Sequence, residues 1–461
     1  MERWRRNPKK LLKLARRSIP IIFIAFFLFG IFFILGKSRK PCIYVIGLDG
    51  STWDIIDPLI QQGKLPVFKK LKENSAWSRL QTFEPTKSAI IWTSIATGKN
   101  MIKHGIVDWS YVNQHGIKVP YSSSKKRAPS IWEILDENNK QSVVLGWFVT
   151  DPPDEINGLM VSDSFAPCLS RYFSRRKGSW NFSNTVQPQT EFKKLLRHFN
   201  QIHRDGSLEY SGLVREMAIP DYFQQYQERY GKGADTVPVL KVWESFLFYN
   251  RVEDILVDYF LDRNDYDLFL AYYRFPDVFF HFGTLFLEKE YHDRLDALID
   301  KQEPSAECLT EFNIKMADIS LPLLRDKEAM LEKVYKKALK ENSYLIVVSD
   351  HGFRLTSKGY CHYDMPSGIE PPEGILMLLG PDIKRNTQIQ ASVYDIAPTI
   401  LYLTGLPVGG DMDGRPLQEA FTSKRPFRTK IYTKMKHCPE KDNRQQDMEK
   451  MKELKALGYI K

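Results

Sequence analysis

The body of this 461-residue chain lacks any excess of basic charge, although the formal net charge of the whole sequence is +10. Residues 1–18 carry +7 and residues 37–40 carry +3, which leaves residues 41–461 with no net charge. Proteins that bind nucleic acid present a basic surface to the phosphate backbone. We therefore expect no nucleic-acid partner.

Cysteine is also scarce, and its spacing lacks any paired motif. The five cysteines, Cys42, Cys168, Cys308, Cys361 and Cys438, lie far apart in the sequence. Zinc ribbons and thiol redox centres need closely spaced pairs, so neither is expected. In an exported domain an odd number leaves at least one thiol unpaired within the chain, and a disulfide between two of the others remains open.

Charged residues are absent from one apolar stretch, "IPIIFIAFFLFGIFFILG" at 19–36. Roughly 20 such residues span a bilayer. A cleaved signal peptide is the alternative, but its apolar core is usually ~7–15 residues long, and no small-x-small cleavage site follows here. We expect a transmembrane anchor at 19–36, between a basic segment at 1–18 and a linker at 37–41. The stronger basic flank predicts a cytoplasmic N-terminus, which makes this a single-pass cell-membrane protein with an extracytoplasmic body.

Three apolar runs end in residues that can bind metals. Ile43–Leu48 leads into Asp49, and Tyr344–Val348 leads into Asp350 and His351. Leu268–Tyr273 leads into Asp277 and, one helical turn later, His281. Runs of β-branched and aromatic residues predict buried strands, and ligands bind at the carboxyl ends of such strands in α/β folds.

Other segments complete an alternating pattern. Further apolar runs lie at Ser142–Phe148 and Ile375–Leu379, and helical periodicity appears at Lys327–Leu339 and Val393–Leu403. The pattern predicts an α/β fold with a largely parallel central sheet flanked by helices on both faces.

The acids and histidines indicate a metal site only when they are considered together. Alone, an Asp-Gly pair after a strand is usually a turn, and His281 between phenylalanines could be a core residue. Together they supply the carboxylate and imidazole ligands that suit zinc. The spacing of Asp277 and His281 places both on one helix face.

Five stretches in this order resemble the type I phosphodiesterase / nucleotide pyrophosphatase family of the alkaline phosphatase superfamily. They are "GLDG" at 47–50, "PTKSAIIWTSIATGKNMIKHGI" at 85–106, "PDVFFHFG" at 276–283, "SDHGF" at 349–353 and "GILMLLGPDIK" at 374–384. The resemblance implies an alkaline-phosphatase-like catalytic domain, which we place at 42–425. A C-terminal extension at 426–461 should end in a helix, because Met448, Met451, Leu454 and Leu457 stand at helical spacing.

The resemblance also implies a nucleophile. Family members carry Thr or Ser at the start of a helix, shortly before a Thr-Gly pair, and Ser88 occupies that place. A helix N-terminus favours a bound phosphoryl group. Ser88 could instead serve only as the N-cap, and Thr86 is a rival hydroxyl that lies before the expected helix start.

Two divalent metal ions, most simply Zn²⁺, are implied as cofactors. By resemblance, one would be held by Asp49, Ser88, Asp350 and His351, and the other by Asp277, His281 and one further histidine. The family pattern Ser-Gly-x-His reads "SGIE" here, so His362 is the expected last ligand and Glu370 the alternative.

The substrate is less well defined by the sequence. Nucleotide-cleaving members carry an asparagine after His-Gly-Ile that contacts the phosphate, but Asp108 and Trp109 stand there as candidate substrate-binding residues. Residues 151–250, with few long periodic segments, are expected to form an insertion that caps the metal site. "SAIIW" lacks the Cys/Ser-x-Pro-x-Arg pattern of sulfatases.

These features predict a membrane-anchored, externally facing phosphodiesterase or related phosphohydrolase that forms a phosphoserine intermediate at a two-zinc site. Two alternatives remain. The first is a transferase that takes a phospho-group from a lipid donor. The second is a metal-free pseudoenzyme that binds a partner.

Overall fold

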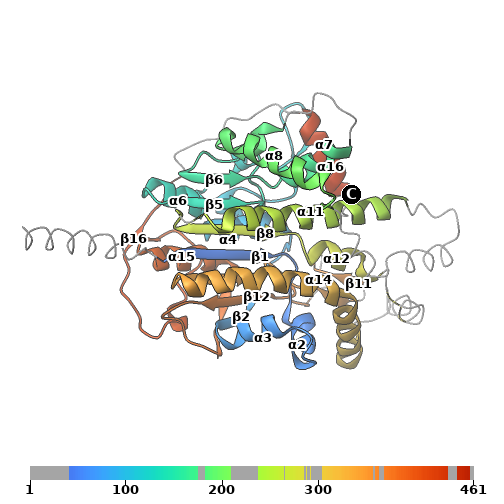
Figure 1. Cartoon of the computed structure of the whole chain (residues 1–461). Coiled ribbons are helices and arrows are strands. Elements are labelled where there is room, and N and C mark those ends of the chain that lie inside the picture. Colours follow the sequence, from blue (N-terminus) through green and yellow to red (C-terminus); the bar gives the residue numbers. More distant parts are fainter. Residues whose placement is uncertain are drawn as a thin grey trace, which may run out of the picture. The chain divides into compact units, whose positions relative to one another are not determined.

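The computed structural model describes residues 41–174, 182–208, 237–263, 265–284, 287, 291, 304–356, 359–362, 368–433 and 444–456. Residues 42–461 form one compact unit. Its centre is a ten-stranded sheet (Figure 1). The strands follow the order β13 (Thr387–Gln388), β2 (Ala76–Gln81), β12 (Gly374–Leu379), β9 (Tyr344–Val348), β1 (Ile43–Leu48), β8 (Leu268–Tyr273), β5 (Ser142–Leu145), β6 (Gly158–Val161) and β7 (Val186–Gln187), and β14 (Ala391–Ser392) pairs with β2.

The middle of the sheet is parallel and fully buried. β1 pairs in parallel with both β8 and β9, and β5 is parallel to β8 and β6. Antiparallel pairing joins β12 to β2 and β9, and β6 to β7. Every residue of β1, β8 and β9 is buried, because these continuous apolar runs face helices on both sides. The predicted α/β fold with a largely parallel sheet is confirmed.

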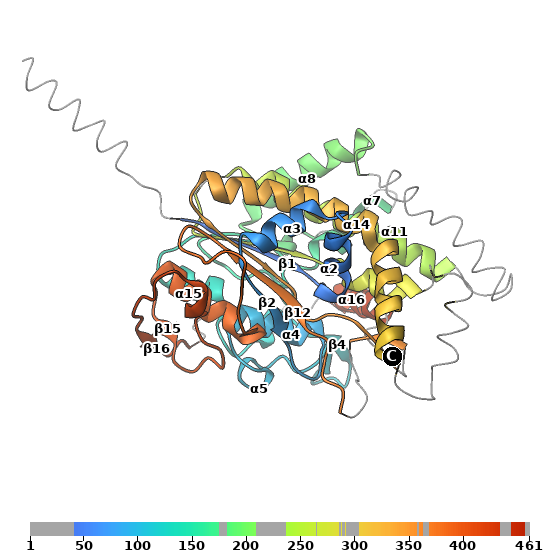
Figure 2. The same cartoon turned by 90° about the horizontal axis from the view of Figure 1, so that it is seen from below.

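Helices cover both faces of the sheet (Figure 2). One face packs against α2 (Trp53–Gln61), α3 (Pro66–Glu73), α7 (Phe165–Ser174), α8 (Gln189–Arg204), α11 (Val237–Leu261), α12 (Asp277–Gly283) and α14 (Ala306–Lys340). The other packs against α4 (Ser88–Thr97), α6 (Ile131–Glu137) and α15 (Ile396–Thr404). Smaller elements are α5 (Met101–His104), the hairpins β3 (Ser110–Val112) with β4 (Lys118–Pro120) and β10 (Arg354–Thr356) with β11 (Gly359–Cys361), the pair β15 (Val408–Gly409) with β16 (Thr429–Lys430), and α16 (Arg444–Ala456).

Several bounds differ from the expected ones. The strand expected at Ser142–Phe148 ends at Leu145, because Gly146 turns the chain with a positive φ of 67°. The helix expected at Lys327–Leu339 is the last third of α14, which is 35 residues long. Between residues 151 and 250 the structure contains α8 and most of the 25-residue α11, although the sequence there shows few long periodic segments.

The C-terminal helix is present as α16. Leu454 is buried and Met451 partly buried, whereas Met448 is 59% exposed, and Leu457 lies outside the described residues. Within the ranges that the structure describes, no helix is long and apolar enough to cross a bilayer. The predicted anchor at 19–36 lies outside those ranges.

Candidate active site

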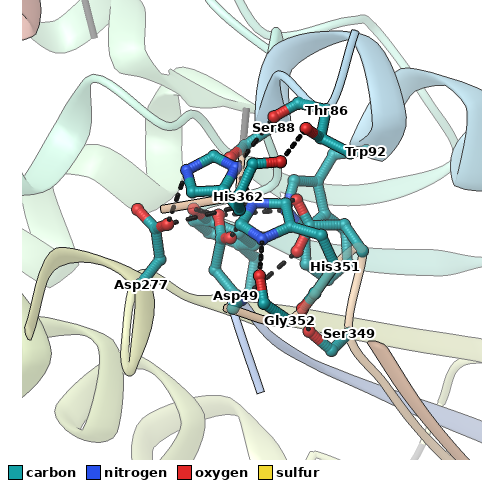
Figure 3. Close-up of polar contacts among 12 residues, drawn as sticks. Asp49, Thr86, Ser88, Trp92, Asp277, Ser349, His351, Gly352 and His362 are labelled. Carbon is teal, nitrogen blue, oxygen red and sulfur yellow. Dashed lines mark hydrogen bonds and ion pairs between the residues drawn. The ribbon is translucent and has the colours of Figure 1, made fainter. Parts of the chain in front are cut away.

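The three acid-bearing strands end at the same side of the sheet, where the side chains of Asp49, Asp277 and His351 gather (Figure 3). Asp49 follows β1, Asp350 follows β9, and Asp277 begins α12 after β8. Their side chains are completely buried. The Asp277 amide donates to the Asp49 carbonyl at 2.9 Å. Gly50 permits this approach, because a Cβ there would lie 2.8 Å from Asp277 Cα.

In each of the carboxylates of Asp49 and Asp350, one oxygen accepts hydrogen bonds and the other accepts none from the described residues. Asp49 Oδ2 accepts from the Tyr272 hydroxyl at 2.5 Å and from Trp92 Nε1 at 3.1 Å. Asp350 Oδ1 accepts from the Gly50 amide at 3.3 Å. The other two oxygens, Asp49 Oδ1 and Asp350 Oδ2, are buried and accept no hydrogen bond within the described part of the chain.

Burial also acts on the protonation of these groups. It raises the pKa of Asp49 well above its usual value, and the negative charges of Asp350 and Asp277 raise it further. Burial likewise raises the pKa of Asp350. Close, buried carboxylates of this kind need a cation or a proton to offset their charge.

Each of two histidines is oriented by a backbone carbonyl. His351 Nδ1 donates to the Gly352 carbonyl at 3.0 Å, and His362 Nδ1 donates to the Thr86 carbonyl at 2.9 Å. A carbonyl only accepts, so the proton sits on Nδ1 and each Nε2 presents a lone pair. Burial, followed by the neighbouring His351 and His281, lowers the pKa of His362. The lowered pKa favours the neutral form of His362, and the carbonyl contacts turn the Nε2 atoms of both rings towards the carboxylates.

The Nε2 atoms converge on the carboxylates. His351 Nε2 lies 3.2 Å from Asp350 Oδ2 and 3.5 Å from Asp49 Oδ1. His362 Nε2 lies 3.5 Å from Asp277 Oδ1 and 3.1 Å from His281 Nε2. The His281 Nε2 atom is itself 3.4 Å from Asp277 Oδ1.

These atoms form two groups that could each hold a metal ion. One contains Asp49, Asp350 and His351, and the other contains Asp277, His351 and His362. His281 adjoins the second group. The donor set fits divalent zinc, because carboxylate oxygens and imidazole nitrogens are buried together. Two of the carboxylate oxygens, Asp49 Oδ1 and Asp350 Oδ2, accept no hydrogen bond from the residues that the structure describes.

Ser88 faces the first group from the start of α4. Its side chain is completely buried, and Oγ lies 3.3 Å from His351 Nε2. The N-cap position belongs to Lys87, which makes no side-chain cap hydrogen bond, so the structure does not support the alternative that Ser88 is only an N-cap. The rival hydroxyl of Thr86 donates to the His362 carbonyl. Of the two candidate nucleophiles, Ser88 is therefore the one whose hydroxyl contacts a metal-binding side chain.

Three other candidate residues, Asp108, Trp109 and Glu370, belong to neither metal-binding group. Asp108 Oδ1 accepts from Lys87 Nζ and from the Trp109 amide, both at 2.7 Å. Trp109 is 5% exposed and packs against Phe148, with ring centroids 5.5 Å apart. Glu370 is exposed and belongs to neither metal-binding group.

Sequence reasoning missed the residues that support the ligands. Tyr272 reaches Asp49 because the parallel register pairs Gly47 with Tyr272, which the sequence does not reveal. Trp92 had a signal, since it stands four residues after Ser88 and so shares its helix face. The histidines are oriented by the backbone carbonyls of Gly352 and Thr86, and nothing in the sequence marks a backbone carbonyl as functional.

Comparisons with known proteins bear on this site. A family model described as type I phosphodiesterase / nucleotide pyrophosphatase matches residues 43–367. A Caenorhabditis elegans protein described as a homolog of the extracellular sulfatase Sulf-1 is 35% identical over 125 residues. That match covers 26% of this chain and 17% of the relative, so the chain spans only a small part of the relative's length.

Two solved structures resemble the chain in fold alone. The 2-O GAG sulfatase BT1596 has a TM-score of 0.50 at 10% identity, covering 86% of this chain and 78% of that one. A Bacteroides thetaiotaomicron protein assigned as a sulfatase has a TM-score of 0.51 at 11% identity, covering 86% and 79%.

Proposed function

Because the chain belongs to the type I phosphodiesterase / nucleotide pyrophosphatase family, we propose that it is a metal-dependent hydrolase of phosphate esters with Ser88 as its nucleophile. The observation that carries this proposal is the position of the Ser88 hydroxyl. It stands at the N-terminus of α4, 3.3 Å from His351 Nε2, and faces two groups of buried metal-binding side chains.

Two divalent metal ions, most simply zinc, would be held by the side chains that converge here. Asp49, Asp350 and His351 would hold one, next to Ser88, and Asp277, His281 and His362 would hold the other. When bound, such ions lower the pKa of a hydroxyl and offset the charge of a phosphoryl group. Asp49 Oδ1 and Asp350 Oδ2 support this assignment, because both are buried without a hydrogen-bond donor in the described structure.

The chain's own groups would act in two steps. The Ser88 Oγ–phosphorus bond forms while the phosphorus–oxygen bond to the alcohol breaks, and the alcohol leaves with a proton. Water then hydrolyses the phosphoryl–Ser88 bond and releases the serine hydroxyl. The positive end of the α4 helix dipole would stabilise the phosphoryl oxygens in both steps.

Asp108 would shape the entrance to this site through its ion pair with Lys87, the residue before Ser88. Trp109 would contribute as a packed support, because its side chain is buried. We further propose that residues 19–36 anchor the protein in the cell membrane with the catalytic domain outside. Protease added to intact cells should remove the domain, and full protection would contradict this orientation.

The function is tested with phosphomonoesters, phosphodiesters, phospholipids and sulfate esters, using the full-length chain in detergent with and without added zinc. We expect zinc-dependent release of alcohol from at least one class of phosphate ester. Asp350→Asn should lower both turnover and bound metal, because it removes one carboxylate of the first group. Unchanged metal content in this variant would contradict the assignment.

A further inference from the structure

A cavity of about 810 Å³ lies beside α5, the short helix that follows α4 in the chain. Its walls come from α5, the β3–β4 hairpin, residues 124–128 and the segment around Asp411 and Tyr432. Figure 2 shows α5 and β4 on the side of the sheet that carries α4. None of the candidate metal ligands lines the cavity. Its volume lies within the roughly 300–1,000 Å³ of small-molecule sites.

Basic side chains dominate the lining. Five of them, Lys99, Lys103, Lys125, Lys126 and Arg127, line the cavity with one acid, Asp411, and Lys103 also pairs with Asp413 at 2.5 Å. Some of these cations serve the fold. Lys126 is buried and pairs with Asp154 at 3.1 Å, and the buried Lys99 pairs with Asp411 at 2.5 Å.

Arg127 differs from these lysines. It is exposed, and within the described part of the chain its guanidinium makes no ion pair or hydrogen bond. Its stem lies over Gly105, where a Cβ would stand 2.9 Å from Arg127 Cγ and Cδ. Gly105 also has a φ of +82°, which disfavours any larger residue. The backbone thus seats Arg127 at the cavity, where its planar fork can bind a phosphate or sulfate with two hydrogen bonds.

Aromatic rings line the same cavity. The Tyr111 and Tyr121 rings lie 5.1 Å apart at an angle of 46°, and Lys125 Nζ lies 4.8 Å from the centre of the Tyr111 ring. Tyr432 closes the wall of the cavity but does not offer its hydroxyl, because it is buried and donates to the Pro407 carbonyl at 2.8 Å. A tyrosine combines a flat apolar face with a polar hydroxyl. Beside a guanidinium, this combination suits a ring-shaped polar ligand that bears an anionic group.

We propose that this cavity binds a sugar carrying a phosphate or sulfate group, with Arg127 contacting the anion and the rings of Tyr111 and Tyr121 contacting the sugar. The site is separate from the candidate catalytic centre, and the proposal does not depend on the proposed hydrolase function. The sugar could be a soluble saccharide or the head group of a membrane lipid, which share this chemistry.

The test measures binding of glucose 6-phosphate to the full-length chain in detergent by titration calorimetry, with glucose and inorganic phosphate as comparison ligands. Glucose 6-phosphate should bind more tightly than either. Arg127→Ala should weaken its binding by about tenfold to a hundredfold, the usual effect of losing a charge-assisted hydrogen bond. Arg127→Lys, which keeps the charge but not the fork, should lose less.

Two control variants distinguish this cavity from binding elsewhere on the protein. Lys118→Ala removes an exposed lysine of the same hairpin that does not line the cavity, and it should leave binding unchanged. Asp350→Asn alters the catalytic centre, and the Arg127-dependent part of the binding should persist in it. Equal binding by wild type and Arg127→Ala would overturn the proposal, as would inorganic phosphate binding as tightly as glucose 6-phosphate. Loss of binding in Asp350→Asn alone would place the ligand in the catalytic centre instead.

Competition identifies the source of the sugar. The protein is reconstituted in phosphatidylcholine vesicles with or without phosphatidylinositol 4-phosphate, and glucose 6-phosphate binding is measured again. Arg127-dependent competition by the lipid would support a head-group ligand. Unchanged binding would support a soluble saccharide.

Discussion

Tyr272→Phe should weaken metal binding without disturbing the fold. The Tyr272 hydroxyl donates to Asp49 Oδ2 at 2.5 Å, and this bond orients the carboxylate towards the proposed metal site. Phenylalanine keeps the ring, which packs edge-on against Trp92 and Phe148 with centroids 5.1 Å away in each case. The substitution therefore removes one hydrogen bond and little packing.

The size of the effect follows from the remaining contacts. Asp49 keeps the Trp92 Nε1 hydrogen bond at 3.1 Å, so its carboxylate is loosened rather than released. Hydrogen bonds to charged groups contribute about 1.5–3 kcal/mol, and loss of a partner that orients a ligand typically costs about 10–100-fold in metal affinity. The hydroxyl also lowers the pKa of Asp49, so its loss should strengthen proton competition for the carboxylate.

The assay is titration of zinc against a competing chelator, at several pH values. The affinity of Tyr272→Phe should fall by about 10–100-fold, with a larger deficit at lower pH. Tyr273→Phe is the matched control, because Tyr273 is the next residue on β8, is equally buried, and lies under Lys327 on the opposite face of the sheet. Equal zinc affinities for the two variants would refute the reasoning.

Three further predictions concern other parts of the molecule. His362→Ala should lower bound zinc, whereas Glu370→Ala should leave it unchanged, because Glu370 is exposed and outside both groups; metal analysis of the purified variants decides between them. Burial raises the pKa of Glu253 to about 8 from 4.5, so this side chain is protonated in the folded state and ionised in the unfolded state between those values. Stability should fall as pH rises through that window, and Glu253→Gln should flatten this slope in denaturant titrations; an unchanged slope would contradict it. Leu454→Ala should cost about 2–5 kcal/mol of stability if α16 stays packed against Trp109 in solution, and a cost below about 0.5 kcal/mol would mean that it does not.

The sequence revealed the parts of the site that follow directly from buried strands. Asp49 and Asp350 each come after a continuous apolar run, and parallel strands bring their carboxyl ends together. His362 could not be placed in the same way. It directly follows the β10–β11 hairpin, in which Arg354 pairs with Cys361. This pairing brings the His362 ring next to His351, with the two ring centroids 3.7 Å apart. The position of His362 therefore depends on the geometry of the hairpin turn, which no periodic pattern in the sequence indicates.

Two elements, α11 and the strand that ends at Leu145, were not predicted correctly because both are rich in buried apolar residues. Helix α11 is apolar around much of its circumference, so it shows no amphipathic period that would mark it as a helix. The run expected as a strand at Ser142–Phe148 is broken by Gly146. Beyond the glycine, Trp147 and Phe148 lie in a loop and pack against Trp92 and Tyr272 respectively. Burial alone does not distinguish a strand from a loop that packs on the core.

The covalent role of Ser88 is the central claim, and rapid acid quenching during turnover tests it most directly. The Ser88 peptide is then examined by mass spectrometry for a phosphoryl group. We expect the modified peptide in the wild type. Ser88→Ala should lack the adduct, lose several powers of ten in turnover at about 1.4 kcal/mol each, and keep most of its metal. Near wild-type turnover in Ser88→Ala, or an adduct on another residue, would contradict the account.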